Sequence, residues 1–215
     1  MADSAVIDRV VKSLHWLGHD AFRLDSSVGP IYFDPFQIKP GPKAAIIFAS
    51  HDHFDHCVPE DVAKVLGPDT VIITEALCAA KLGGRARVMK PGQSLEVMGV
   101  AVKAVRAYNT DKQFHPKGHN WLGFLVTVDG VTIYHAGDTD HTPEMSELGK
   151  VDIALLPVSG TYVMTPTQAA EAAKVIRPGI AIPMHYGAIV GGDPDAQSFA
   201  QTLKGVVPVK ILPKE

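Results

Sequence analysis

The chain has 215 residues and a mass of 23.0 kDa, and its residues are 46% hydrophobic and 20% charged. This balance predicts one globular domain over residues 1–215 with its own apolar core. The formal net charge is −3, from 20 basic and 23 acidic residues, so no overall positive field attracts nucleic acid and we expect no nucleic-acid partner. No apolar run approaches the ~20 residues of a membrane-spanning helix, so we expect no membrane span.

The two cysteines, Cys57 and Cys78, are too few for a disulfide framework, and we expect them to be reduced thiols. The N-terminal segment lacks the basic stretch and apolar core of a secretory signal. Together these features predict a cytoplasmic protein. The sequence makes no prediction of the oligomeric state.

Short apolar segments separated by Gly, Pro and Asp dominate the first half of the chain, and this pattern is typical of strands. The strands expected there are, in chain order, Val10–Leu17, Ala21–Leu24, Ile31–Phe33, Ala45–Ala49, Val71–Thr74, Arg87–Met89, Ser94–Val97 and Val100–Ala107.

The second half of the chain begins with a predicted hairpin. Its strands, Trp121–Val128 and Val131–Tyr134, flank an Asp-Gly turn at residues 129–130. Further strands are expected over Ile153–Pro157, Ile180–Pro183 and Val209–Leu212.

Three helices interrupt the strands. One is expected to begin at Pro59 and to end at Gly67. Thr165 and Gln168 form a capping box that opens a second helix, and Asp193, followed by proline, opens the last. Many strands with a few helices predict an α+β fold in which stacked sheets are covered by helices on the outside.

The densest group of potential metal ligands is the segment His51-Asp52-His53-Phe54-Asp55-His56. It follows an apolar strand and precedes the Pro59 helix, so it forms a loop at a strand end, where rigid scaffolds present functional side chains. Imidazole and carboxylate suit zinc, iron or manganese, and the H-x-H-x-D-H spacing lets alternate residues face two adjacent metals. The segment therefore predicts a metal site.

Other strand ends carry further potential ligands. Asp138, in a Gly-Asp-Thr motif, follows the strand Val131–Tyr134, and His185 follows the strand Ile180–Pro183. Asp34 ends an earlier apolar strand, from where it could orient a ligating histidine.

These spaced motifs resemble the metallo-β-lactamase superfamily. The resemblance extends over nearly the whole chain, from Leu17-Gly18-His19-Asp20 to His185, with the motifs in the order of that family. The chain is most similar to small bacterial and archaeal metal-dependent hydrolases near the ascorbate-phosphate-lactonase and phospholipase-D-like branches. The resemblance implies a four-layer αββα sandwich with the metals at the sheet edge.

The resemblance also implies a ligand set. One metal would be bound by His51, His53 and a third histidine from the loop after the strand that ends near Ala107, the other by Asp55, His56 and His185, and Asp138 would bridge both. The expected cofactor is one or two zinc ions, with iron or manganese as alternatives. Asp55 would also accept or relay a proton from the reacting water.

The third histidine of the family pattern falls where this chain has Asn109. Three alternatives follow: Asn109 binds through its oxygen, His115 or His119 replaces it, or that metal position is weak, empty or specialised for iron or manganese. We therefore predict Asp55, Asn109 and His115 as catalytic residues beside the ligands.

The segment from residue 109 to residue 120 contains Lys112, His115, Lys117 and His119 against one acidic residue, Asp111. Such a positive cluster beside a metal favours a phosphate or carboxylate on the substrate, although a solvated loop has the same composition. We expect the partner to be a small-molecule substrate, with an anionic group on it if the positive cluster is functional.

These features predict a metal-dependent hydrolase in which a metal-bound hydroxide attacks an ester, lactone or phosphodiester bond. The alternative is a non-hydrolytic metal-binding or redox protein with a mononuclear iron or manganese site, since iron-using relatives replace ligands in the same loop. A partner-binding protein with a vestigial site is a third hypothesis.

Overall fold

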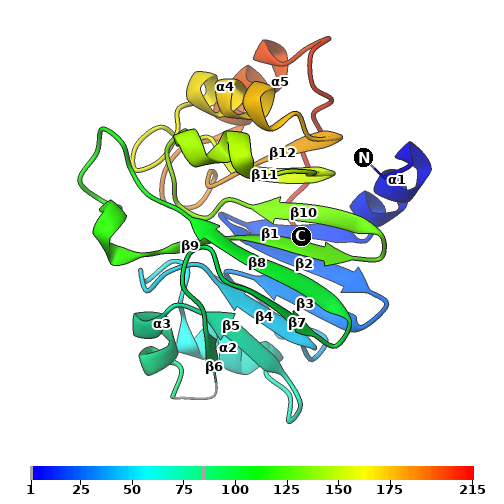
Figure 1. Cartoon of the computed structure of the whole chain (residues 1–215), viewed down its shortest axis with the longest axis vertical. Coiled ribbons are helices and arrows are strands. Elements are labelled where there is room, and N and C mark those ends of the chain that lie inside the picture. Colours follow the sequence, from blue (N-terminus) through cyan, green and yellow to red (C-terminus); the bar gives the residue numbers. More distant parts are fainter. Residues whose placement is uncertain (1, 84–85) are drawn as a thin grey trace.

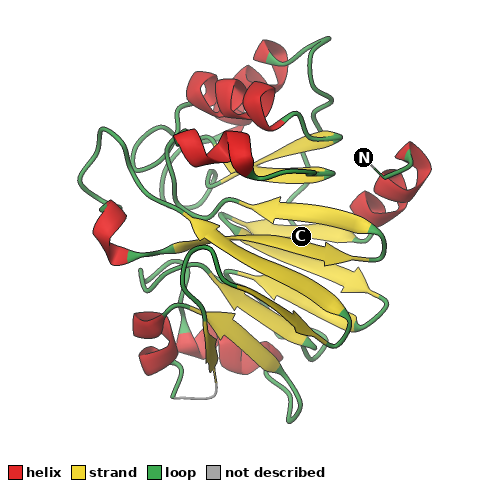
Figure 2. Ribbon diagram, viewed as in Figure 1, coloured by secondary structure: helices red, strands yellow, loops and turns green. Residues whose placement is uncertain are grey.

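The computed structural model describes residues 2–83 and 86–215 of the chain. Two six-stranded sheets lie between groups of helices, and Figure 2 shows the strands in the middle with helices at opposite ends of the view. The expected α+β sandwich is confirmed, with its layers visible in Figure 1.

The first sheet has the spatial order of the chain. Its strands are β1 (Leu14–Gly18), β2 (Ala21–Ser26), β3 (Gly29–Phe33), β4 (Ile46–Ala49), β5 (Val71–Thr74) and β6 (Ala86–Val88). β1 to β3 pair antiparallel, and β3 to β6 pair parallel.

The second sheet follows the same plan. Its strands are β7 (Ser94–Val97), β8 (Val100–Arg106), β9 (Leu122–Val128), β10 (Val131–His135), β11 (Ile153–Pro157) and β12 (Ile180–Met184). β7 to β10 pair antiparallel, and β10 to β12 pair parallel. Parallel strands bring their carboxyl ends, and the loops that follow them, to one edge of each sheet.

The helices lie outside the sheets. Figure 1 shows α4 and α5 at one end of the molecule and α2 and α3 at the other. The α-helices are α1 (Ser4–Lys12), α2 (Pro59–Val65), α3 (Ala76–Lys81), α4 (Pro166–Ile176) and α5 (Asp193–Thr202), and the 3₁₀ helices are η1 (Lys117–His119) and η2 (Pro143–Glu147).

The two sheets share one apolar core. Phe33 and Phe48 of the first sheet are fully buried and stack with ring centroids 5.1 Å apart. Phe48 also meets Phe124 of the second sheet at 4.9 Å. Such aromatic contacts remove large apolar areas from water and fix how the sheets face each other.

Two local predictions are confirmed. β9 and β10 form the expected hairpin, in which Asp129 (φ 54°) and Gly130 (φ 79°) adopt the left-handed conformation that a tight two-residue turn needs. The capping box is also present, because Thr165 accepts from the backbone of Gln168 and the Gln168 side chain accepts from the backbone of Thr165.

One predicted strand begins too early, and another is wrong. Val10 and Val11 belong to α1, where they are buried with Ile7 at helical spacing, and the strand begins only at Leu14. An apolar run alone does not distinguish the helical period of about 3.6 residues from the strand period of about two residues. Residues 209–212 form no strand beyond an isolated bridge from Val209.

The expectation of reduced thiols is also wrong, because Cys57 and Cys78 form a disulfide with their Cα atoms 6.0 Å apart. Both cysteines are buried, and the bond ties the loop after β4 to α3. Folding brings the two thiols together across 21 positions of sequence, which cysteine counting did not anticipate. The argument from thiols to a cytoplasmic location therefore no longer applies.

In the described part of the chain, no helix combines the length and hydropathy needed to cross a membrane.

Candidate metal centre

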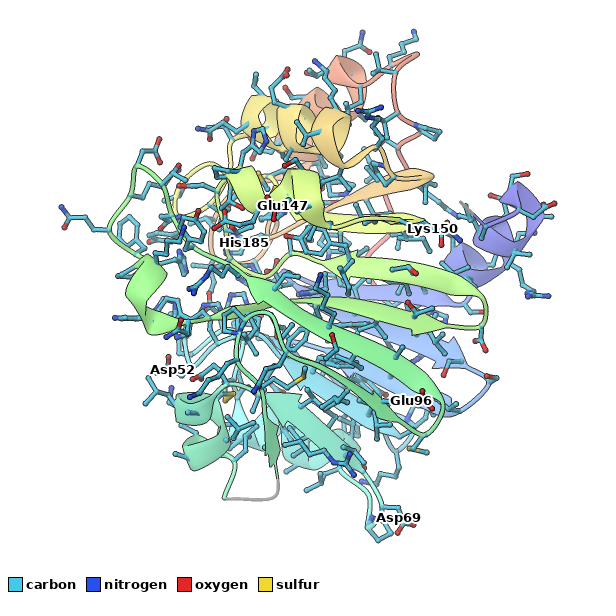
Figure 3. All side chains as sticks on the ribbon, in the orientation of Figure 1. Asp52, Asp69, Glu96, Glu147, Lys150 and His185 are labelled. Atoms are coloured by element: carbon cyan, nitrogen blue, oxygen red, sulfur yellow. A yellow bond between two sulfur atoms is a disulfide. The ribbon has the colours of Figure 1, made fainter. Side chains whose placement is uncertain are left out.

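The predicted ligands meet at one edge of the sandwich because each follows a strand of the same orientation. Residues 51–56 follow β4, Asp138 follows β10, and His185 follows β12. In Figure 3, Asp52 and His185 lie on the same side of the view, away from Glu96 at the opposite side.

The backbone around this edge has unusual torsion angles. His19 (φ 53°), Asp34 (φ 38°) and His185 (φ 60°) are left-handed although none is glycine, and such strain is common at functional sites. Gly137 (φ 60°) also needs its missing side chain, because a Cβ there would lie 2.8 Å from the carbonyl oxygen of Leu122.

Two groups of donor atoms converge there. In each group, the potential ligand atoms lie within 4.8 Å of one another. The first group is His51, His53 and His115, and the second is His19, Asp55, His56 and His185.

Asp138 lies between the two groups. Its Oδ1 is 3.4 Å from Nε2 of His56, and its Oδ2 is 3.0 Å from Nε2 of His115 and 3.2 Å from Nε2 of His185. Burial would raise the pKa of this carboxyl, but the charges of His185 and His56 hold its pKa well below the usual range. Asp138 is therefore an ionised carboxylate in contact with both groups.

Four histidines are oriented by a hydrogen bond at Nδ1, which leaves Nε2 directed at the centre. The pairs are His51 with Ser50 Oγ (2.9 Å), His56 with Asp34 Oδ2 (2.8 Å), His115 with Asn109 Oδ1 (3.0 Å) and His185 with Ser159 Oγ (2.8 Å).

Buried polar atoms without hydrogen-bond partners indicate that these residues fit a metal. Among the described residues, five buried atoms of this cluster have no hydrogen-bond partner: Nδ1 of His19, Nε2 of His51, His56 and His115, and Oδ1 of Asp138. An unsatisfied buried polar atom costs about 1–3 kcal/mol, so native proteins rarely leave several together without a further partner. Burial also lowers the pKa of His51 and of His53, which favours the neutral imidazole that binds metals.

Of the three alternatives for the missing histidine, the geometry favours His115. Asn109 Oδ1 accepts from both the backbone N–H (2.9 Å) and the ring Nδ1 of His115, while its Nδ2 donates to the carbonyl oxygen of Tyr162 (2.9 Å). Both the oxygen and the nitrogen of the Asn109 amide thus have hydrogen-bond partners beside the cluster. His119 is exposed and packs against Trp121 at 4.7 Å.

The two lysines of the segment from residue 109 to residue 120 already form ion pairs. Lys112 lies 2.8 Å from Asp111 and 2.6 Å from Asp140, and Lys117 lies 2.9 Å from Glu144. The loop therefore offers much less net positive charge than its composition indicates, which weakens the ground for expecting an anionic substrate.

His19 is a site residue whose role the sequence left open, because a Gly-His-Asp turn suits either a side chain that lines the site or a local turn hydrogen bond. It is fully buried, its Nε2 lies 3.1 Å from Oδ2 of Asp55, and its ring lies 4.1 Å from the ring of His185. The only signal was its place in a Gly-His-Asp turn. Tyr186, which follows His185, stacks on Trp16 with the ring centroids 4.6 Å apart.

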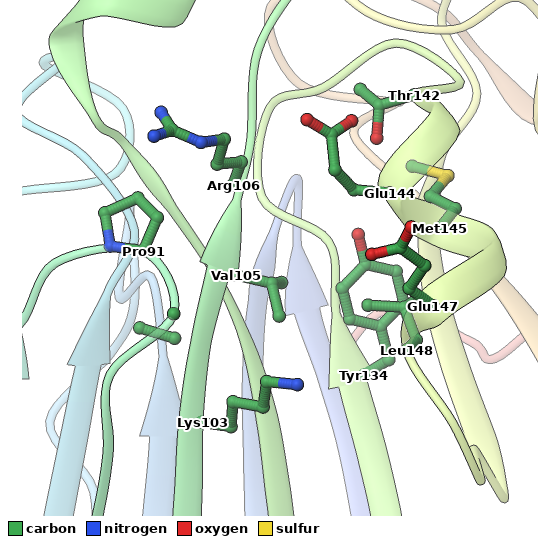
Figure 4. A pocket seen from close by; sticks show the side chains of 12 residues that line it. Pro91, Lys103, Val105, Arg106, Tyr134, Thr142, Glu144, Met145, Glu147 and Leu148 are labelled. Carbon is green, nitrogen blue, oxygen red and sulfur yellow. The ribbon is translucent and has the colours of Figure 1, made fainter.

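A cavity of about 360 Å³ opens onto the centre, and it is lined by His53, Phe54, Asp55, Phe114, His115, Asp138, Tyr162 and Ile189. A second cavity, of about 230 Å³, lies beside β8 and is lined by Lys103, Arg106 and Glu144 among others (Figure 4). No histidine is among the described residues that line the second cavity, so the first is the candidate site.

Comparison with known proteins supports this assignment. Residues 13–185 match the beta-lactamase superfamily domain. A UPF0173 metal-dependent hydrolase of Staphylothermus marinus is 34% identical over 219 residues, which cover 93% of this chain and 94% of that protein.

Two solved structures share the fold. A protein of Parabacteroides distasonis superposes with a TM-score of 0.86 at 34% identity, covering 94% of this chain and 93% of that one. Igni18, a metallo hydrolase of Ignicoccus hospitalis, superposes with a TM-score of 0.76 at 25% identity, covering 94% and 95%.

Proposed function

Because the chain belongs to the UPF0173 family of metal-dependent hydrolases, within the metallo-β-lactamase superfamily, we propose that it binds two metal ions and hydrolyses an ester, lactone or phosphodiester bond of a small molecule. Zinc is the metal we propose first, since imidazole and carboxylate ligands in this number suit it, with iron or manganese next.

The convergence of unpartnered histidine nitrogens on Asp138 carries this proposal. His51, His53 and His115 would hold one ion, Asp55, His56 and His185 the other, and Asp138 would contact both. When bound, two adjacent ions supply Lewis acidity and bring the pKa of a water toward about 7. The place of His115 beside His51 and His53 supports three donors for the first ion and weighs against the mononuclear redox alternative, so we propose no second function.

Asp55 is the residue we propose as proton acceptor. Burial would raise the pKa of its carboxyl, but the hydrogen bond from His19 holds the pKa below its usual value, so the carboxylate is ionised at neutral pH. It also lines the cavity, where it can take a proton from a water beside the substrate. His19 fixes the orientation of the acceptor oxygen.

The cavity volume supports a small-molecule substrate, because it lies within the usual range for such sites. Lys112 and Lys117 already pair with carboxylates, so they give no support to an anionic substrate. Only the positive charge of bound metal ions would favour a negative charge on the substrate.

The test is hydrolysis of three probes, p-nitrophenyl acetate, γ-butyrolactone and bis(p-nitrophenyl) phosphate, by metal-free protein and by protein reloaded with zinc, manganese or iron(II). We expect at least one probe to be hydrolysed only after reloading, and the Asp138→Ala variant to lose both metal and activity. Unchanged activity and metal content in Asp138→Ala would contradict the proposal.

A further inference from the structure

Large apolar side chains are concentrated at the mouth of the site. In the described part of the chain, Phe54 (70% exposed), Phe114 (50%) and Ile189 (39%) are among the few large apolar side chains exposed to solvent, and all three line the same cavity. They come from three loops, after β4, β8 and β12, that lie far apart in sequence. An exposed apolar patch beside a cavity typically marks a binding surface.

Aromatic contacts support these walls. The ring of Phe114 meets Tyr162 edge-on at 4.7 Å, and Phe54 meets the buried Phe36 edge-on at 6.4 Å. Each exposed ring is thus backed by a second aromatic ring, which limits its motion at the cavity mouth.

The walls carry no cationic side chain. Neither lysine nor arginine is among the described residues that line the cavity. The neighbouring cations also have acceptors, since Lys81 lies 3.7 Å from Asp52, Lys112 lies 2.6 Å from Asp140, and Lys117 pairs with a carboxylate. The charged and ligating groups, including Asp55 and Asp138, form the floor, so the cavity has a polar floor and apolar walls.

We propose that Phe54, Phe114, Tyr162 and Ile189 form an apolar clamp that selects substrates with an uncharged alkyl or aryl group next to the hydrolysed bond. This inference rests on the proposed hydrolase function and assigns its substrate class. Burial of each methylene between such walls increases the affinity by up to about 4-fold. A small molecule suits the position better than a second copy of the chain, because a protein seated on the clamp would close the route to Asp55 and Asp138.

The experiment measures binding without turnover, by calorimetry on zinc-loaded protein with three hydroxamates. Acetohydroxamate and hexanohydroxamate share the metal-binding group and differ in chain length. The third probe, adipic monohydroxamate, has the same six-carbon chain as hexanohydroxamate but ends in a carboxylate. We expect hexanohydroxamate to bind about 30-fold more tightly than acetohydroxamate, and adipic monohydroxamate to bind no more than about 3-fold more tightly.

Variants assign the preference to the clamp. The Phe54→Ala/Phe114→Ala double variant should reduce the chain-length preference to about 3-fold and keep its metal content, because neither ring offers a metal ligand. Val206→Ala, at an exposed valine that does not line the cavity, is the control and should keep the full preference.

Three results would overturn the inference: equal affinity for the two uncharged probes, tighter binding of the carboxylate probe, or a native dimer that the double variant converts to monomer without changing the preference. A failure of the hydrolase proposal alone would look different. The chain-length preference would then be present, but p-nitrophenyl hexanoate would show no metal-dependent hydrolysis. Binding of none of the three probes would overturn both proposals.

Discussion

The side-chain oxygen of Asn109 lies 3.0 Å from Nδ1 of His115 and 2.9 Å from the backbone nitrogen of the same residue. Asn109 occupies the position where the family pattern led us to expect a ligand, and it instead holds a histidine six positions later in the ligand group. This contact explains how the chain can lack a histidine at position 109 and still have three histidines in the first donor group.

Replacement of Asn109 should therefore weaken metal binding without removing a ligand. In Asn109→Ala, the Nδ1 of His115 loses its acceptor and the ring loses its orientation, so we expect metal affinity to fall about 10- to 100-fold. The measurement is competition with a chromophoric chelator. Asn109→Asp keeps an acceptor at the same position and should lose much less. Equal loss in both variants, or none in either, would refute the positioning role.

His115 and His119 form a matched pair for assigning the third ligand. His115 lies in the donor group, whereas His119 is exposed. We expect His115→Ala to hold about one metal fewer per chain and to lose activity, while His119→Ala keeps both. Metal analysis of the two purified variants measures this difference. Loss of metal in His119→Ala alone would reverse the assignment.

The disulfide between Cys57 and Cys78 should contribute to stability. Closing a loop of this length restricts the unfolded chain by about 3 kcal/mol, which corresponds to roughly 6–12 °C in Tm for a chain of this size. Thermal unfolding with and without a thiol reductant measures the effect, and the Cys57→Ser/Cys78→Ser variant, in which reductant should have no effect, is the control. An unchanged Tm on reduction of the native protein would contradict the prediction.

Glu144 should stabilise the fold above its ordinary pKa and less so in acid. Burial would raise the pKa of its carboxyl, but Lys117 and the Tyr108 hydroxyl hold the pKa at about 2, below the ordinary value of 4.5. Since the folded-state pKa is the lower one, the contribution is complete above about pH 4.5 and is lost as the pH falls toward 2.

The effect should be small because the Glu144 side chain is partly exposed. We expect Glu144→Gln to lower the free energy of unfolding by at most about 1 kcal/mol at pH 6, and by less at pH 3. Denaturant unfolding of both proteins at the two pH values measures this. A difference that grows on acidification would have the wrong sign.

The sequence predicted most strand ends, and with them the residues that meet at one edge of the sandwich, because strand and motif signals are local. The H-x-H-x-D-H segment, Asp138 and His185 each follow an apolar run, and the structure brings them together where those runs end. The sequence left Asn109, His115 and His119 open as the residue near His51 and His53. The choice depends on how the loop after β8 folds back and places His115.

Other misses have the same cause. The disulfide depends on a contact between α3 and the site loop, and the place of His19 in the site depends on a left-handed turn that no periodicity reveals. The apolar walls come from Phe54, Phe114 and Ile189 in three loops far apart in sequence, so only the fold brings these side chains together.

Elemental mass spectrometry of the native protein and of Asp138→Ala, after dialysis against a mild chelator, tests the central claim most directly. A two-metal centre held by these residues predicts about two metal ions per native chain and a marked loss in Asp138→Ala, because that carboxylate contacts both donor groups. One ion or none in the native chain, or full retention in Asp138→Ala, would contradict the account.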